Sequence, residues 1–158
     1  MPGLDIAEQK SWQNFLECGL RCYASLNRRL TDKHNLSLFE VRVLDLLGTA
    51  DNGSARMGDL AEALPSLPSR LTRQVGRLEA QGLVRRETDP EDRRGVVASI
   101  TEDGRTVVRQ AMVTYAHGVR SFYLGQLSRP QIAAMGENCR RISAALKRAE
   151  QPTKLGRL

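Results

Sequence analysis

GLVRRETDPEDRRGVVASIT, residues 82–101, contains two short β-prone runs on either side of a polar turn. The runs are residues 83–87 and 96–100, and the turn between them contains proline, glycine and the adjacent arginines Arg93 and Arg94. Two such runs joined by a glycine-containing turn are typical of a β-hairpin. The sequence therefore predicts a hairpin with two arginines near its tip.

Immediately before the hairpin, residues 68–81 have the pattern of a helix that ends at Gly82, a good residue for the end of a helix. Arg70, Arg73 and Arg77 follow one another at steps of three and four, so we expect them along one side of this helix. The apolar positions Leu71, Val75 and Leu78 are expected to be buried. A helix of this kind fits the major groove of a nucleic-acid duplex, while the hairpin tip reaches the neighbouring minor groove.

Two further helices are expected upstream of this segment. Ser37 and Glu40 form a capping-box pattern at the start of one helix, which ends in a turn at residues 51–53. A short helix follows at residues 57–64, and Ser66 is expected to cap the helix that begins at Pro68. Two short helices joined by a tight turn and followed by a hairpin make a winged helix-turn-helix.

Long apolar helices are predicted on both sides of this motif. The first covers residues 4–30 and is followed by a polar break at residues 31–36. Thr101 begins another that is expected to run to about Leu127, and the last covers about residues 130–148. Exposed apolar helix surfaces usually mark sites of protein–protein interaction. A two-fold dimer built from these helices would space two recognition helices for successive major grooves.

The predicted fold is therefore mainly α, with a small β-hairpin wing and a winged helix-turn-helix embedded between long terminal dimerisation helices. We expect an N-terminal dimerisation helix in residues 1–36, the winged helix-turn-helix in 37–104 and C-terminal dimerisation helices in 105–158, all within one compact domain.

Composition limits the classes of function. The 158 residues carry a formal charge of +6, which favours a polyanionic partner without choosing between DNA, RNA and an anionic surface. Three cysteines without metal-ligand spacing favour a reducing cytoplasm and predict no metal site. There is no signal-peptide pattern and no apolar run long enough to span a membrane. No phosphate loop, nucleophile elbow or His-carboxylate cluster indicates an enzyme, and no cofactor is expected.

Five segments together resemble the MarR family of bacterial transcriptional regulators. They are residues 38–44, 60–61, 71–86, 89–94 and 100–105, the last two of which contain DPEDRR and ITEDGR. The resemblance implies a helical dimer with interlocking terminal helices and one winged helix-turn-helix per subunit on pseudo-palindromic DNA. Most members of this family repress promoters, many release DNA when a small aromatic ligand binds, and some respond to thiol oxidation or zinc.

The resemblance and the residue types suggest roles for individual side chains. Arg70 is expected to read guanine, whereas Arg73 and Arg77 are expected mainly to contact phosphates. In the wing, Arg94 would enter the minor groove, oriented by Asp92, and Arg93 would touch a phosphate. The predicted DNA contacts are Ser66, Pro68, Ser69, Arg70, Thr72, Arg73, Arg77, Asp92, Arg93 and Arg94.

Each of these roles has a structural alternative. The helix arginines would instead form a solvated face paired with Glu79 and other acids, and the wing pair would only stabilise its turn. Two positions depart from the family pattern. Leu67 stands where relatives carry a polar helix cap, and Gly76 replaces an acidic residue in the middle of the helix.

Two sets of residues are candidates for sensing a signal. Aromatic side chains that could line a ligand pocket are Trp12, Phe15, Tyr23, Tyr115 and Phe122, although aromatic residues at helical spacing are more often part of a core. Cys18 and Cys22 are candidates for a redox switch, with buried structural cysteines as the alternative.

The sequence thus favours a homodimeric DNA-binding repressor in the cytoplasm, released by a small aromatic ligand. Its alternatives are a regulator switched by oxidation of Cys18 and Cys22, and an interaction module that keeps the winged fold but does not bind DNA.

Overall fold

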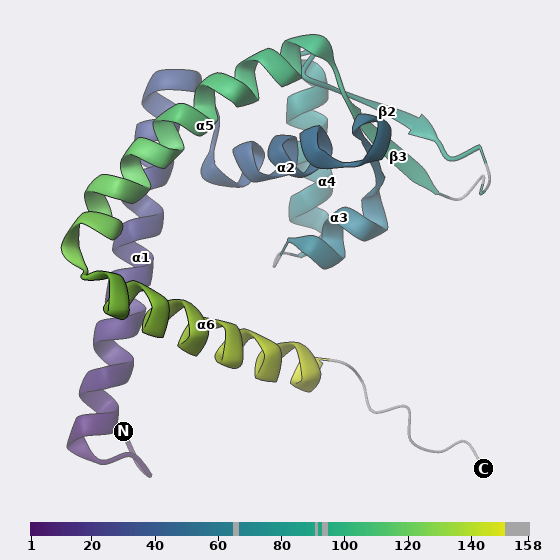
Figure 1. The fold of residues 1–158 in the computed structure, drawn as a ribbon. Helices are drawn as coiled ribbons and strands as arrows, with labels where there is room; N and C mark the ends of the chain where they lie inside the picture. Colours follow the sequence, from purple (N-terminus) through teal and green to yellow (C-terminus); the bar gives the residue numbers. More distant parts are fainter. Residues whose placement is uncertain (65–66, 91, 93–94, 151–158) are drawn as a thin grey trace, which may run out of the picture. The chain divides into compact units, whose positions relative to one another are not determined.

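The computed structural model describes residues 1–64, 67–90, 92 and 95–150 of the chain. It divides into two compact units, Met1–Val119 and Arg120–Leu158. Helices make up most of both units (Figure 1). Among the described residues, no helix combines the length and the apolar character that crossing a membrane requires.

Helix α1 covers Ile6–His34 and is longer at its C-terminal end than the sequence predicts. Asp5 and Glu8 form a capping box at its start, which is why the helix begins at Ile6 and not at Leu4. The break expected from residue 31 onward is wrong, because nothing in residues 31–34 disrupts the helix. It ends at Asn35, which has a left-handed backbone (φ 54°) and donates its N–H to the carbonyl of Thr31.

Helix α2, Leu38–Thr49, starts at the predicted capping box. The Glu40 N–H donates to Ser37 Oγ at 3.1 Å, and the Ser37 N–H donates to Glu40 Oε2 at 2.7 Å. The predicted turn follows as the short 3-10 helix η1, Asp51–Gly53. Strand β1, Ser54–Arg56, comes next and was not predicted, because three residues are too few to show an alternating pattern.

The helix-turn-helix consists of α3, Met57–Ala63, and α4, Pro68–Ala80. Leu67 is the N-cap of α4 and makes no side-chain cap hydrogen bond. Ser66, the cap that the sequence predicts, lies outside the described residues. Pro68 occupies the first turn as expected, where its missing N–H costs nothing. Gly82 follows the helix with φ 72°, a conformation that favours glycine.

The predicted hairpin is confirmed. Strands β2, Val84–Thr88, and β3, Val96–Ile100, pair antiparallel from Val84 opposite Ile100 to Thr88 opposite Val96. Strand β1 pairs with the other edge of β3, so the sheet has the order β1-β3-β2. The wing is therefore part of a three-stranded sheet.

Thr101 connects the sheet to α5, Glu102–Phe122. Its hydroxyl oxygen accepts from the Gly104 N–H at 3.0 Å and donates to the Gly82 carbonyl at 2.7 Å. The helix ends before the predicted Leu127. A Cβ on Gly125 would lie 2.9 Å from the Arg120 carbonyl oxygen, so the chain turns tightly here, in the 3-10 helix η2, Leu124–Gln126. Helix α6, Arg129–Glu150, then completes the second unit.

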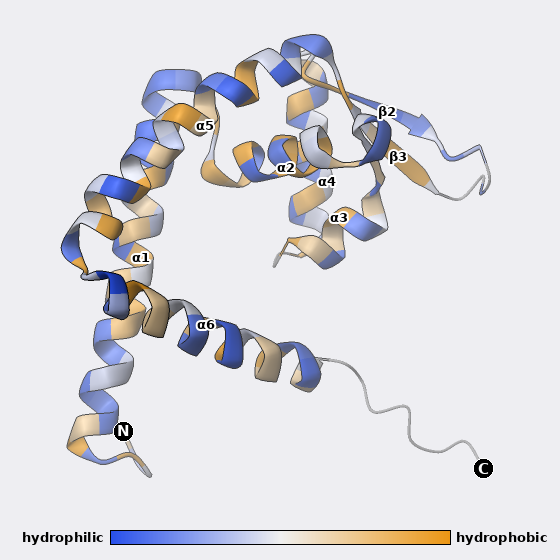
Figure 2. Cartoon of the chain, in the orientation of Figure 1, coloured by the Kyte–Doolittle hydropathy of each residue, from blue (hydrophilic) through white to orange (hydrophobic). Residues whose placement is uncertain are grey.

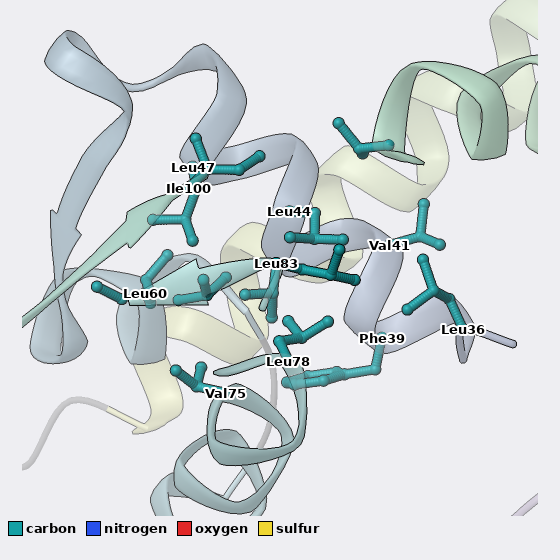
Figure 3. Packing of buried hydrophobic residues seen from close by; sticks show 14 of the residues in the cluster. Leu36, Phe39, Val41, Leu44, Leu47, Leu60, Val75, Leu78, Leu83 and Ile100 are labelled. Atoms are coloured by element: carbon teal, nitrogen blue, oxygen red, sulfur yellow. The ribbon is translucent and has the colours of Figure 1, made fainter. Parts of the chain in front are cut away.

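One hydrophobic core holds the winged motif together. It draws on α1 through Leu30, on α2, α3 and α4, on the sheet and on the first half of α5 (Figure 3). Leu44, Leu47, Val75 and Leu78 have no exposed surface. Because α4 packs through this face, its opposite face is directed to solvent. Apolar and polar residues alternate along α1 and α6, where several large apolar side chains remain exposed (Figure 2).

Candidate nucleic-acid interface

Helix α4 presents a distinct outward face. Leu71, Val75 and Leu78 are buried, whereas the positions on the opposite side of the helix are solvent-directed. We call this set the outward face: Ser69, Thr72, Arg73 and Gly76. Among the residues that the structure describes, Arg73 has neither an ion-pair nor a hydrogen-bond partner. Its guanidinium is therefore available to an external anion.

Arg70 does not share this environment. Its guanidinium carbon lies 5.0 Å from the centre of the Phe39 ring, and its Nη2 donates to the Tyr23 hydroxyl at 3.2 Å. Phe39 belongs to α2 and Tyr23 to α1, so Arg70 contacts two other helices. Arg70 is nevertheless exposed to solvent, so its side chain has room to adopt another conformation.

Arg77 also turns towards α2. Its Nε lies 3.3 Å from Oε1 of Glu40, whose side chain has no exposed surface, while the Arg77 side chain is 52% exposed. This oxygen makes no aligned hydrogen bond, so the contact is chiefly Coulombic. The three arginines expected on one stripe are thus divided, with Arg70 and Arg77 against neighbouring helices and Arg73 on the outward face.

The alternative to DNA contact pairs Glu79 with the helix arginines, but in the structure the partner of Glu79 is on the sheet. Arg86 of β2 donates its Nε to Glu79 Oε2 at 2.8 Å and its backbone N–H to Glu79 Oε1 at 3.1 Å. The side-chain hydrogen bond from Arg86 holds the pKa of Glu79 below its usual value. These bonds fasten the end of α4 to the first strand of the wing.

The base of the wing turn is held by Asp89. Its side chain is almost completely buried, and Oδ2 lies 2.6 Å from Nε of Arg56 in β1. The backbone N–H of Asp89 donates to the Gly95 carbonyl at 2.9 Å, and the Gly95 N–H donates to the Asp92 carbonyl at 2.8 Å. These contacts close the turn and place Asp92 at its exposed side.

Arg93 and Arg94 lie outside the described residues. That Asp92 orients Arg94 therefore stays a prediction, as do the contacts of Ser66, which also lies outside them. Pro68, Ser69 and Thr72 are all exposed at the start of α4, and the Thr72 hydroxyl donates to the Pro68 carbonyl at 3.0 Å.

The candidate effector residues do not share one environment. Trp12 and Phe15 of α1 are about half exposed, and their ring centres are 6.0 Å apart. Tyr23 contacts Arg70, and Tyr115 packs against the hydrophobic core. Phe122 belongs to the second unit. Only Trp12 and Phe15 are brought together as a pair of rings.

The cysteines differ from a sensing thiol. Burial, the neighbouring Cys18 and a hydrogen bond to it all raise the pKa of Cys22, whereas a reactive thiol needs a lowered pKa. Arg21, the nearest cation in sequence, pairs with Glu17 at 2.7 Å. Among the described residues, no group of three or more His, Cys, Asp or Glu side chains could hold a metal ion.

Several contacts of the site were not expected from the sequence. The sequence predicts Glu40 as a helix cap but not as the partner of Arg77, and it includes Phe39 only as part of the family segment 38–44. The sequence gives no indication of the contact between Arg56 and Asp89, because it does not predict the strand β1 that carries Arg56. Since Phe39 and Glu40 precede α4 by about thirty positions in the printed sequence, only the fold reveals these contacts.

Comparison with known proteins agrees with this geometry. The model of the MarR family matches residues 34–95, which contain the helix-turn-helix and the first strand of the wing. The uncharacterized HTH-type transcriptional regulator YfiV of Bacillus subtilis is 31% identical over 119 residues, 75% of this chain and 72% of that protein.

Two solved structures from Streptomyces coelicolor have closely similar folds. One is the MarR family regulator Sco3205 in complex with DNA, with a TM-score of 0.90 and 29% identity over 99% of this chain and 96% of that chain. The other is the MarR family regulator AbsC, with a TM-score of 0.86 and 28% identity over 93% and 99% of the two chains. With its winged helix-turn-helix and these relatives, the chain belongs to the MarR family of DNA-binding transcriptional regulators, and is not an enzyme.

Proposed function

We propose that this protein is a homodimeric repressor that binds pseudo-palindromic promoter sites and is released by a small aromatic ligand. The observation that carries the DNA-binding part is the outward face of α4. It places an unpaired arginine and two hydroxyl groups on a helix whose other side is fixed in the core.

In this proposal α4 enters the major groove. Arg73 contacts a phosphate, and Ser69 donates to a phosphate or a base edge. Thr72 donates to a phosphate after its hydroxyl leaves the Pro68 carbonyl. Arg70 reads a base after leaving Tyr23 and Phe39. Pro68, in the first turn of α4, and Arg77, paired with Glu40, mainly hold the helix in place and contact DNA less. The wing residues Asp92, Arg93 and Arg94 keep the minor-groove role that the family resemblance implies.

Exposed apolar side chains support the dimer. Those on α1 lie at helical spacing, and Leu20 and Phe15 are 62% and 50% exposed. Water contact with so many apolar groups is unfavourable, and a second copy would remove it. A two-fold pair would place the two α4 helices on half-sites about 10 bp apart, or a multiple of that.

Release by a small aromatic ligand is supported by one pair of rings and by one structural relative. The adjacent rings of Trp12 and Phe15 offer an apolar surface on which an aromatic molecule could stack. A structural relative, BpsR of Bordetella bronchiseptica, was studied for regulation of its DNA binding by 6-hydroxynicotinic acid. A regulator of bacterial promoters of this kind acts in the cytoplasm.

Selection of bound sequences from a random DNA library tests the proposal directly. A pseudo-palindromic motif with half-sites about 10 bp apart is expected, with affinity that falls steeply with salt. Binding without a symmetric motif would contradict the dimer on DNA. No salt-sensitive binding at all would favour the interaction module. A promoter fusion carrying the selected site then tests repression, which predicts lower transcription when the protein is present.

A further inference from the structure

An exposed leucine stands at the start of the helix that is proposed to enter the major groove. Leu67, the N-cap of α4, is 73% exposed and directly precedes Pro68. Of the large apolar side chains that the structure describes between residues 37 and 101, one other is exposed, Val96 at 41%. The winged motif thus covers its remaining large apolar side chains wholly or in part, and Leu67 is the most exposed of them all.

The backbone at Leu67 is held in place. A residue before proline is restricted to an extended conformation, and Leu67 has φ −67° and ψ 139°. Its carbonyl oxygen accepts from the N–H of Arg70 at 2.9 Å and from the N–H of Leu71 at 3.2 Å. Since Leu71 is buried in the core, these bonds tie Leu67 to the packed part of the motif. The exposed leucine therefore has a fixed place beside Ser69 and Arg70, which are also exposed.

Leucine does not stabilise the start of this helix. Ser, Thr, Asp and Asn are preferred as N-caps because their side-chain oxygens accept a hydrogen bond from the first turn, which leucine cannot do. The family resemblance also implies a polar cap at this position. In the free protein Leu67 therefore contributes neither a cap nor much buried surface, and a role in the complex with DNA accounts for it better.

The chemistry of the major groove identifies what an apolar side chain can recognise there. The N-terminal residues of a recognition helix contact base edges. These edges carry hydrogen-bond donors and acceptors, and thymine adds an apolar C5-methyl group. Because leucine neither donates nor accepts, the methyl group is the feature that it can distinguish. We propose that Leu67 determines sequence specificity by packing against a thymine methyl group in each half-site. This inference rests on the proposed entry of α4 into the major groove.

Uracil in place of thymine tests the proposal, because it removes the methyl group and keeps every hydrogen-bonding group. In an operator selected by the full-length chain, each thymine is replaced in turn, in one half-site and then in both, and affinity is measured by fluorescence anisotropy. At one position the loss is expected to be about fourfold for one half-site and about fifteenfold for both. Leu67→Ala is expected to bind thymine and uracil at this position equally.

Two further variants separate recognition of the methyl group from a structural role. Leu67→Met keeps a long apolar side chain and is expected to retain the preference for thymine. Leu67→Ser supplies the missing cap, so it is expected to raise the midpoint of thermal unfolding and to lose the preference. Wild-type affinity that is insensitive to uracil at every position, or a preference that persists in Leu67→Ala, would overturn this inference alone. A selection that yields no motif would contradict the proposed function, and this inference with it.

Discussion

Nε of Arg77 lies 3.3 Å from Oε1 of Glu40, a carboxylate that has no exposed surface. The same carboxylate caps the start of α2, so one buried charge joins the capping box of α2 to the middle of α4. A buried carboxylate is costly unless a cation or hydrogen bonds compensate for its lost hydration. Arg77 therefore helps to hold α4 in position, and its phosphate contact stays a prediction.

This role predicts different effects for two neighbouring arginines. Arg77→Met is expected to lower the free energy of unfolding by about 1–3 kcal/mol. This is less than the loss of a fully buried ion pair would cost, because the Arg77 side chain is half exposed. Arg73→Met is expected to leave stability unchanged, and to lower the slope of log affinity against log salt by about 0.9. Urea unfolding and DNA titrations at several salt concentrations provide both measurements.

The double variant Glu40→Gln with Arg77→Met is the control. It removes the buried charge together with its partner, so it is expected to recover part of the stability lost in Arg77→Met. If the slope of log affinity against log salt falls equally in Arg77→Met and Arg73→Met, Arg77 also contacts a phosphate.

The contact of Arg70 with Tyr23 predicts a gain of DNA affinity. If Arg70 must give up this 3.2 Å hydrogen bond to reach DNA, Tyr23→Phe removes a cost of binding. An exposed hydrogen bond contributes about 0.5–1.5 kcal/mol, so affinity is expected to rise no more than about tenfold. Fluorescence anisotropy with a selected operator measures this. The gain should be absent when Arg70→Ala is already present, and a loss of affinity in Tyr23→Phe alone would disprove the model.

The sequence predicted those features that depend on neighbouring residues. Ser37 with Glu40, Gly82 and Thr101 each fix a helix end through contacts within a few positions, and the sequence predicts all three ends. The hairpin was predicted for the same reason. Contacts between separate elements were not. Periodicity places Arg70 and Arg77 on one side of α4, but only the packing of α1 and α2 shows that this side is partly covered.

Gly76 offers a test of the outward face. A Cβ at this position would meet only the Arg86 guanidinium, at an ordinary 3.8 Å. Gly76→Ala is therefore expected to stabilise the protein by about 0.5–1 kcal/mol, because alanine has the higher helix propensity. If DNA lies close against this face, the added methyl group lowers DNA affinity in spite of the greater stability. Thermal unfolding and operator titration measure the two effects, and an unchanged affinity would place DNA elsewhere on α4.

Gly104, in the family segment ITEDGR, shows the opposite behaviour. A Cβ there would lie 2.2 Å from the Leu83 carbonyl oxygen and 2.8 Å from the Ile100 side chain. Gly104→Ala is expected to cost at least about 1–3 kcal/mol through overpacking at the base of the hairpin. Gly58→Ala in α3 is the matched control, because a Cβ at Gly58 meets no atom within 4 Å. Equal stability of the two variants in urea would show that the motif glycine is not required for packing.

His34 gives the fold a predicted dependence on pH. Burial, and secondarily the charge of Lys33, lower the pKa of His34 from its usual 6.5, and its Nε2 lies 2.8 Å from the hydroxyl oxygen of the buried Thr114. Because the folded state binds this proton less readily than the unfolded state, stability is complete above pH 6.5 and decreases as the pH falls through the lowered pKa. Urea unfolding between about pH 7.5 and 5 is expected to show this decrease. His34→Gln keeps a polar group beside Thr114 but does not titrate, so its stability should depend less on pH. An identical pH dependence in both proteins would assign the acid sensitivity to other groups.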